Sequence, residues 1–377
     1  MEQQGGSENI SEVIFLAFHN FIGGKIVRRL TCMIFILLIL SGCANNSATN
    51  KSVDGVQRSQ QPSYEEIEAT NPEEIGATSP KEIDSPSPEE IGVEDATKTA
   101  ELDTYEITMK RDLLCLMLAY PEFISGVERG SNKEVYVIMK SGKKLLYDDK
   151  TKKTYDQKLA DADLQDTMEL LYPLDDISEL MKENYDPGRI RSYALLNEVY
   201  GGTKQKIEKN LKGISIGGKV CSFNLSNGAA EALKQAAKEI SALAESNNNI
   251  YKNVFPVNGT YNYRVIAGTN QLSPHAYAIA VDFKSDKRDY WKWASREQGQ
   301  KRINEYPREV VKALEEKNFI WGGKWAHFDI LHFEYRPELI IKAKNYTDKF
   351  ETGEPWYNGF ASEDASVKSY IEMIDKI

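Results

Sequence analysis

The sequence lacks several features that would assign it to a familiar class of protein. It has no apolar run of about 18 residues, the minimum for a membrane-spanning helix, which argues against a bilayer-spanning protein. Only 4 of its 377 residues are cysteine, too few for a disulfide scaffold. It also lacks a basic excess, because 47 Lys and Arg stand against 57 Asp and Glu. This balance argues against a nucleic-acid partner, since such proteins present a basic face.

The negative charge is confined to one segment. Residues 44–103 hold 4 basic and 14 acidic side chains, whereas the segments on both sides are charge-balanced. The segment is rich in Asn, Ser, Thr, Pro and Glu and repeats units similar to Pro-Glu-Glu-Ile. One isoleucine per repeat cannot build a core, and the acidic excess extends the chain, so we predict a disordered acidic tether. A specific binding repeat is the alternative.

Residues 1–43 have the pattern of an export signal. Leu30–Leu40 is an apolar run that follows three basic residues, Lys25, Arg28 and Arg29. It ends in Ser41-Gly42-Cys43, and the whole segment resembles a bacterial lipoprotein signal peptide. The resemblance implies lipidation of Cys43 and a lipid anchor at the extracellular face of the bacterial cell membrane. An apolar run with a chance cysteine is the alternative.

From about residue 104 the composition becomes that of a folded protein. Apolar periodicity predicts helices at Asp112–Tyr120, Asp161–Lys182, Ala229–Ala244 and Pro307–Lys317. Strands are predicted at Glu134–Met139, Lys143–Tyr147, Tyr261–Ile266, Ala278–Phe283 and Phe328–Tyr335. Because helices and strands do not alternate regularly, we predict an α+β fold, a small antiparallel sheet with flanking helices.

The same pattern suggests how the folded part is divided. We expect an N-terminal accessory α+β region at 104–185 and the functional domain at 186–377. Asp186-Pro187-Gly188 begins the second part, and we interpret residues 186–191 as a surface turn; an arginine placed near the substrate is the alternative. The two cysteines of the folded part, Cys115 and Cys221, lie among apolar residues and are either a disulfide or two buried thiols.

The histidines outside the export signal lie in two short segments, each with a carboxylate close by. His275 precedes an apolar strand in which Asp282 is a carboxylate that needs a partner, either a metal ion or Arg264. The second segment adds three candidate groups, His327, Asp329 and His332. A zinc hydrolase needs three protein ligands, an open position and a carboxylate base, and the two segments supply enough groups. For each histidine taken alone, a hydrogen-bonded core residue is the alternative.

Three blocks of sequence resemble the zinc metallopeptidases of the D-alanyl-D-alanine carboxypeptidase family (VanY-like): Tyr263–Thr269, Ser273–Asp282 and Trp321–Pro337. That family also includes D-Ala-D-Ala dipeptidases and L-alanyl-D-glutamate endopeptidases. The likeness covers residues 186–342 well and the region from 104 more weakly. It implies that the predicted antiparallel sheet carries a zinc site.

Matching positions imply the role of each site residue. The Zn²⁺ ligands would be His275, Asp282 and His332. Asp329 would be the general base, and Arg264 would bind the substrate carbonyl or the developing oxyanion. The last matched residue, Ser273, would contact the substrate or orient the first ligand.

Three further features are not explained by the matched positions. Ala278 stands where many family members have glycine, a departure that matters only if φ is positive there. His327 has no family role, and we expect it beside the ligands, in contact with Asp329. The aromatic residues Tyr290, Trp291 and Trp293 form either a substrate wall or part of the core, and we favour the core.

The resemblance implies hydrolysis of D-Ala-D-Ala termini in the stem peptides of peptidoglycan, a D,D-carboxypeptidase activity. Cleavage of the L-alanyl-D-glutamate bond by the same chemistry is the first alternative. A non-catalytic wall-binding lipoprotein on the same fold is the second. The expected partners are the stem peptide and, through the lipid anchor, the membrane; no protein partner is inferred.

Overall fold

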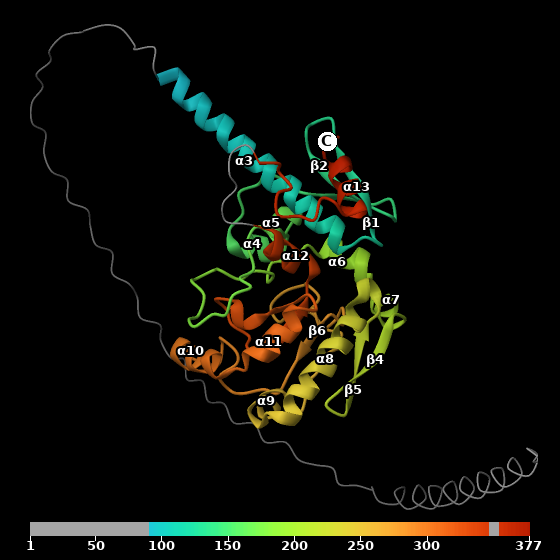
Figure 1. Cartoon of the computed structure of the whole chain (residues 1–377), viewed down its shortest axis with the longest axis vertical. Helices are drawn as coiled ribbons and strands as arrows, with labels where there is room; N and C mark the ends of the chain where they lie inside the picture. Colours follow the sequence, from blue (N-terminus) through green and yellow to red (C-terminus); the bar gives the residue numbers. More distant parts are fainter. Residues whose placement is uncertain (1–89, 347–353) are drawn as a thin grey trace, which may run out of the picture. The chain divides into compact units, whose positions relative to one another are not determined.

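Small antiparallel sheets surrounded by helices make up the described part of the chain, residues 90–346 and 354–377 of the computed structural model (Figure 1). The predicted α+β class is confirmed. The export signal, Cys43 and the tether up to residue 89 lie outside the described residues. Within the described ranges, no helix combines the length and the apolar character that a membrane crossing needs.

The sheet that positions the candidate site has three strands in the order β6-β8-β7. β8 (His332–Tyr335) lies in the middle and pairs antiparallel with β6 (Ala280–Asp282) and with β7 (Phe319–Trp321). All four residues of β8 are buried. Its register places Asp282 directly opposite His332, so these two polar side chains are cross-strand neighbours.

Two hairpin-based sheets complete the β-structure of the described residues. The first contains the hairpin predicted around Ser141-Gly142 and consists of β1 (Ile124–Arg129), β2 (Val135–Met139) and β3 (Lys144–Leu146). The second was not predicted and consists of β4 (Leu211–Ile216) and β5 (Lys219–Asn224). Its turn, Gly217-Gly218, has φ angles of 53° and 83°, which glycine adopts without strain.

The predicted amphipathic helices form as their apolar spacing requires. α8 (Ala229–Ser246) buries Leu233, Ala237 and Ile240. This face packs against the β4–β5 hairpin and against α11 (Arg308–Glu315), the helix predicted after Pro307 (Figure 1).

The other helices are mostly short. They are α3 (Glu90–Ala119), α4 (Tyr155–Ala160), α5 (Leu164–Met168), α6 (Tyr193–Leu196), α7 (Lys204–Glu208), α9 (Asn248–Val254), α10 (Arg296–Glu305), α12 (Pro337–Asn345) and α13 (Ala365–Ile374). Single turns of other helix types are η1 (Asn197–Gly201), η2 (Ser226–Gly228) and η3 (Gly322–Lys324). α3 begins inside the segment predicted as a tether and includes the predicted helix Asp112–Tyr120 except for its last residue.

Three predicted elements are wrong or too long. The helix predicted at 161–182 shrinks to α5 (Leu164–Met168), and Pro173 inside the predicted range disfavours a continuous helix across it. The strand predicted at 261–266 is absent. This segment is part of a loop, and its backbone pairs with the same loop through the isolated bridge between Val265 and Leu272. The strand at 328–335 begins only at His332, because the preceding residues bond to the 289–291 loop: Trp291 donates to Phe328, and Ile330 donates to Asp289.

Cys115 on α3 and Cys221 on β5 are both buried and free, so the alternative of two buried thiols holds.

A buried ionic cluster holds the N-terminal region against α12. The Asp112 carboxylate on α3 has no exposed surface and accepts hydrogen bonds from Tyr147 (2.9 Å) and Tyr346 (2.8 Å). Its third partner is the ammonium group of Lys342 on α12, at 2.8 Å. A buried carboxylate with one cation and two hydroxyl donors is fully compensated, so the cluster ties segments that are far apart in the sequence.

Replacing Asp112 by alanine is expected to destabilise the protein, because it leaves the Lys342 ammonium without a counter-charge. The expected loss is about 3–5 kcal/mol of unfolding free energy, measured by urea denaturation. The matched control is Glu128→Ala, which removes an exposed pair with Lys144 (2.8 Å) and should change stability by less than about 0.5 kcal/mol. Equal losses in the two variants would contradict this interpretation.

Candidate metal centre

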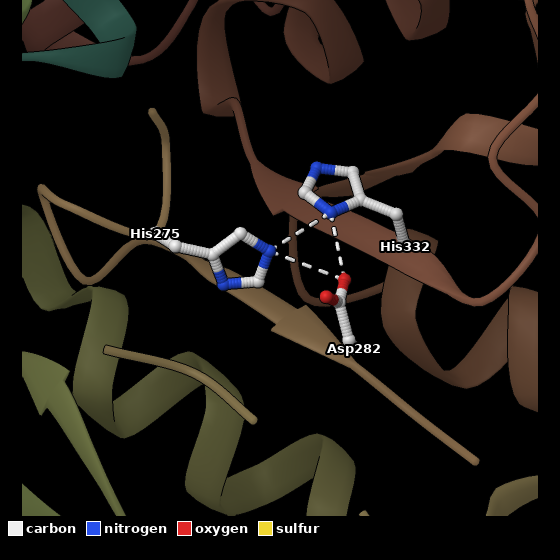
Figure 2. A group of neighbouring side chains, drawn as sticks. All are labelled: His275, Asp282 and His332. Carbon is white, nitrogen blue, oxygen red and sulfur yellow. Dashed lines mark hydrogen bonds and ion pairs between the residues drawn. The ribbon is translucent and has the colours of Figure 1, made fainter. Parts of the chain in front are cut away.

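The three predicted ligands, His275, Asp282 and His332, converge at one end of the β6-β8-β7 sheet. His275 Nε2 lies 3.2 Å from His332 Nδ1 and 3.2 Å from Asp282 Oδ1, and the last two atoms are 2.9 Å apart. The side chains point toward one another from two strands and the turn before β6 (Figure 2). The structure therefore places two imidazole nitrogens and one carboxylate oxygen at the corners of a small triangle.

A tight turn brings His275 to this triangle. The hydroxyl of Ser273 accepts a hydrogen bond from the His275 amide (3.3 Å), and the Ser273 carbonyl accepts one from Ala276 (2.7 Å). Ala278 then closes the turn with its amide donating to the His275 carbonyl at 3.1 Å. Its φ is 55°, so the departure from glycine noted in the sequence falls at a position that favours glycine. Ser273 is buried, and its contact fits the orienting role.

Each histidine is oriented by a partner on its other ring nitrogen. His275 Nδ1 lies 2.6 Å from the carbonyl oxygen of Thr260, which can only accept, so Nδ1 carries the hydrogen and Nε2 has its lone pair free. His332 Nε2 faces the buried Glu334 carboxylate at 3.7 Å and leaves Nδ1 toward the triangle. Imidazole–carboxylate contacts of this kind fix ligands at metal sites.

The charges of the triangle are strongly coupled. Burial lowers the pKa of His332, but hydrogen bonding to Asp282 and the Glu334 carboxylate raises it to about 10. Burial raises the pKa of the Asp282 carboxyl, but the two imidazoles hold it well below its usual range. The Asp282 carboxylate is thus anionic beside a His332 ring that favours its protonated form, and a divalent cation that bound there would displace the proton of His332.

The donor set and its spacing fit a small cation. A tetrahedral site with bonds of about 2.0–2.1 Å separates its ligand atoms by about 3.3 Å. The observed separations of 2.9, 3.2 and 3.2 Å are close to that value. Three protein ligands also leave one position for water or substrate, as in catalytic rather than structural sites.

A second group of carboxylates does not make a comparable site. Asp148, Asp149 and Asp163 also lie near one another. The ammonium group of Lys153 lies 2.9 Å from Asp149 and 3.0 Å from Asp163, and that of Lys150 lies 3.1 Å from Asp148, so each carboxylate already pairs with a cation.

Asp329, the predicted base, lies on the loop between β7 and β8. Its amide donates to the Gly322 carbonyl at 2.9 Å, and its carbonyl accepts from the His332 amide at 3.1 Å. A side chain at Gly322 would meet the Asp329 carbonyl at 2.5 Å, so this approach requires glycine. Burial and the Asp282 charge raise the pKa of Asp329 to about 7, against the opposing effect of His332. A carboxyl with this pKa is suited to take and return a proton.

Arg264 is not part of the triangle. It is exposed, and its side chain makes no hydrogen bond or ion pair with any described residue. Its backbone carbonyl accepts from the Ser273 amide at 3.0 Å. Tyr290, which is bridged to Asp329, has a pKa that burial and the Asp329 charge raise and that the Arg264 charge lowers. The guanidinium of Arg264 therefore remains available to a substrate.

Two expectations about the surroundings are wrong. His327 does not contact Asp329 through its ring; its Nδ1 donates to Asp186 at 2.6 Å. The segment 186–191 is not a surface turn, because Asp186 and Arg191 are buried. The aromatic group at 290–293 is only partly core, since Trp293 is 78% exposed.

Three residues that support the site were not predicted, and the local sequence marks only one of them. Thr260 acts through its backbone carbonyl, which every residue type provides. Glu334 and Arg191 are separated by 143 positions, yet they form two hydrogen bonds of 2.8 and 2.7 Å. An acidic residue in an apolar strand is the one signal the sequence offered, and Glu334 fits it.

Comparison with protein families matches residues 267–335 to a family model described as D-alanyl-D-alanine carboxypeptidase. No curated protein and no solved structure matched the chain. The matched residues contain the three clustered ligands and Asp329, while Arg264 lies just before them. Residues 267–335 are thus similar to the D-alanyl-D-alanine carboxypeptidase family of peptidases, the family that the sequence resembled.

Proposed function

We propose that the protein is a zinc metallopeptidase that hydrolyses D-Ala-D-Ala termini of peptidoglycan stem peptides. The observation that carries this proposal is the His275–Asp282–His332 triangle, which lies in the family-matched segment together with Asp329. The two imidazoles and one carboxylate are the ligand types that zinc hydrolases use.

The residues around the triangle supply the remaining functions. A bound zinc ion would polarise the scissile carbonyl and lower the pKa of water. Asp329 accepts a proton from the attacking water and returns it to the leaving amine, as its pKa near neutrality allows. Arg264 offers an unpaired positive charge where negative charge develops. Ser273 and Thr260 hold His275 in its orientation throughout.

Mass spectrometry of digested muropeptides tests this assignment. Loss of one terminal alanine from a stem ending in D-Ala-D-Ala is the expected result. Cleavage next to the sugar-linked alanine would instead establish the L-alanyl-D-glutamate endopeptidase. Purified protein without stoichiometric zinc and without hydrolysis would support the wall-binding lipoprotein.

We also propose that lipid on Cys43 holds the protein at the extracellular face of the cell membrane. The support is the sequence pattern that ends at this cysteine. Labelling with a fatty-acid analogue should mark the wild type but not Cys43→Ala, and labelling of both would overturn the assignment.

Two substitutions should separate metal binding from proton transfer. Asp329→Asn is expected to keep zinc but to lose about 10²- to 10⁴-fold in kcat, because the base is removed. His332→Ala should lose zinc, as measured by metal analysis after dialysis. The matched control is His327→Gln, a histidine outside the triangle, which should keep zinc. Normal zinc content in His332→Ala would exclude this residue as a ligand, and full turnover in Asp329→Asn would exclude Asp329 as the base.

Zinc affinity should rise with pH. The pKa of His332 is raised to about 10, so below that pH zinc must displace a proton from this ring. For one displaced proton, the affinity increases about tenfold per pH unit between pH 6 and 8, as measured by calorimetric or competition titration. Asp329→Asn should show the same slope, since His332 is the source of the proton. An affinity independent of pH would contradict the proton displacement.

A further inference from the structure

A cluster of side chains next to the candidate metal centre has no part in the reaction proposed above. Asp186 is fully buried, and its carboxylate accepts hydrogen bonds from the Tyr155 hydroxyl and from the His327 amide (2.9 Å) and Nδ1 (2.6 Å). Tyr155 stacks on His327 at a centroid distance of 5.5 Å, and Trp291 meets His327 edge-on at 4.5 Å. Arg189 completes this group, which we call the Arg189 cluster.

The turn that carries Arg189 is fixed on both sides. At one end Asp186 is held by its three donors, and at the other Arg191 forms two hydrogen bonds with Glu334, at 2.8 and 2.7 Å. Between them Gly188 has a φ of 90°, and a side chain there would meet Ile320 of β7 at 2.3 Å. The backbone at Arg189 is therefore held from both sides.

The guanidinium of Arg189 is only partly used. Its Nη1 donates to the Tyr155 hydroxyl at 2.8 Å and lies 3.8 Å from the Asp186 carboxylate. Its Nε and Nη2 make no hydrogen bond with any described residue, and 22% of the side chain is exposed. The Nε–Nη2 edge is the fork that binds a carboxylate through two parallel hydrogen bonds.

Two aromatic residues link the Arg189 guanidinium to the loop of the candidate base. The Arg189 guanidinium lies 5.7 Å from the centroid of Trp291, whose amide donates to the Phe328 carbonyl at 3.0 Å. The neighbouring residue Tyr290 is bridged to Asp329. The charge of Arg189 also lowers the pKa of Tyr290 against the raising effects of burial and Asp329, so the guanidinium lies within electrostatic reach of the site.

We propose that Arg189 is a specificity-determining residue that binds a carboxylate group of the peptide substrate through its free Nε–Nη2 edge. This inference rests on the proposed peptidase function and names the chemistry that selects its substrate. Trp291 supplies an apolar face beside the cation, and Tyr155, from the N-terminal region, holds the guanidinium at its other edge. Residues 104–185 would thereby contribute directly to the substrate site.

A stem peptide offers two sources of this carboxylate, the C-terminus and the α-carboxyl of its glutamate. The test compares wild type with Arg189→Gln on three synthetic peptides ending in D-Ala-D-Ala: the free acid, the C-terminal amide and the glutamate α-amide. With the free acid, Arg189→Gln should raise KM about 10- to 100-fold with little change in kcat, the effect of losing charge-assisted hydrogen bonds. On one of the amides the variant should match wild type, and that amide identifies the bound carboxylate.

Lys292→Gln is the matched control, because Lys292 is an exposed cation 5.3 Å from the same Trp291 ring. It should leave KM within about twofold, since a solvent-exposed charge is screened. Equal effects of Arg189→Gln on all three peptides would overturn the proposal, as would an equal effect of Lys292→Gln. Zinc content and melting temperature of Arg189→Gln should equal those of wild type, which separates substrate binding from a structural defect.

Failure of the proposed function gives a different result. If wild type with zinc hydrolyses none of the peptides, the peptidase assignment fails. Calorimetric binding of the free acid to wild type and to Arg189→Gln then decides on Arg189: tighter binding by wild type supports it, and equal binding overturns it.

Discussion

The buried carboxylate of Glu334 is the interaction on which the rest of the structure depends. It lies in the middle strand of the central sheet with no exposed surface. Burial raises its pKa, but the guanidinium groups of Arg191 and Arg336 hold the pKa well below its usual range, so it stays charged. It faces His332 on one side and anchors the turn before α6 on the other. A charge in this position is tolerated only because both cations are in place.

The chain of contacts continues from the sheet to the N-terminal region. Arg336 also pairs with Glu338 at 2.6 Å, and Glu338 accepts from the Tyr120 hydroxyl at 2.6 Å. The loop that carries Asp329 is held in a similar way, because the Trp325 indole donates to the Pro187 carbonyl at 2.7 Å. The candidate ligands and the candidate base are therefore positioned by one continuous polar network rather than by independent loops. Rigid support of this kind is what a catalytic constellation needs.

The sequence predicted the chemistry of the site better than the shape of the backbone around it. The family resemblance implied that His275, Asp282 and His332 are ligands, the need of Asp282 for a partner in an apolar strand agreed with it, and the structure brings the three together. The amphipathic helix α8 was equally visible in the apolar spacing. The loops at 261–266 and 328–331 look like strands in sequence, yet their backbone bonds to other loops. Apolar periodicity cannot predict whether a segment bonds to a strand or to a loop, because the partners of its backbone lie elsewhere in the chain.

The contacts of His327 show the same limit at the level of side chains. Its neighbour in sequence, Asp329, was the natural partner to expect. Its actual partner is Asp186, 141 positions away, which also binds Tyr155. Only the folded chain reveals that the N-terminal region reaches this part of the molecule.

The alanine at position 278 has a consequence for how the site behaves without its cation. Its methyl group excludes many of the backbone conformations that a glycine would visit, while the fold holds its φ at 55°. Asn224 closes the turn from outside, with its amide donating to the Ala278 carbonyl at 2.9 Å. The turn is thus held by hydrogen bonds, and the Nδ1 bond to the Thr260 carbonyl at 2.6 Å leaves the His275 imidazole little freedom to swing away when nothing is bound. A cation would bind to side chains that are already ordered, so its binding would cost little conformational entropy.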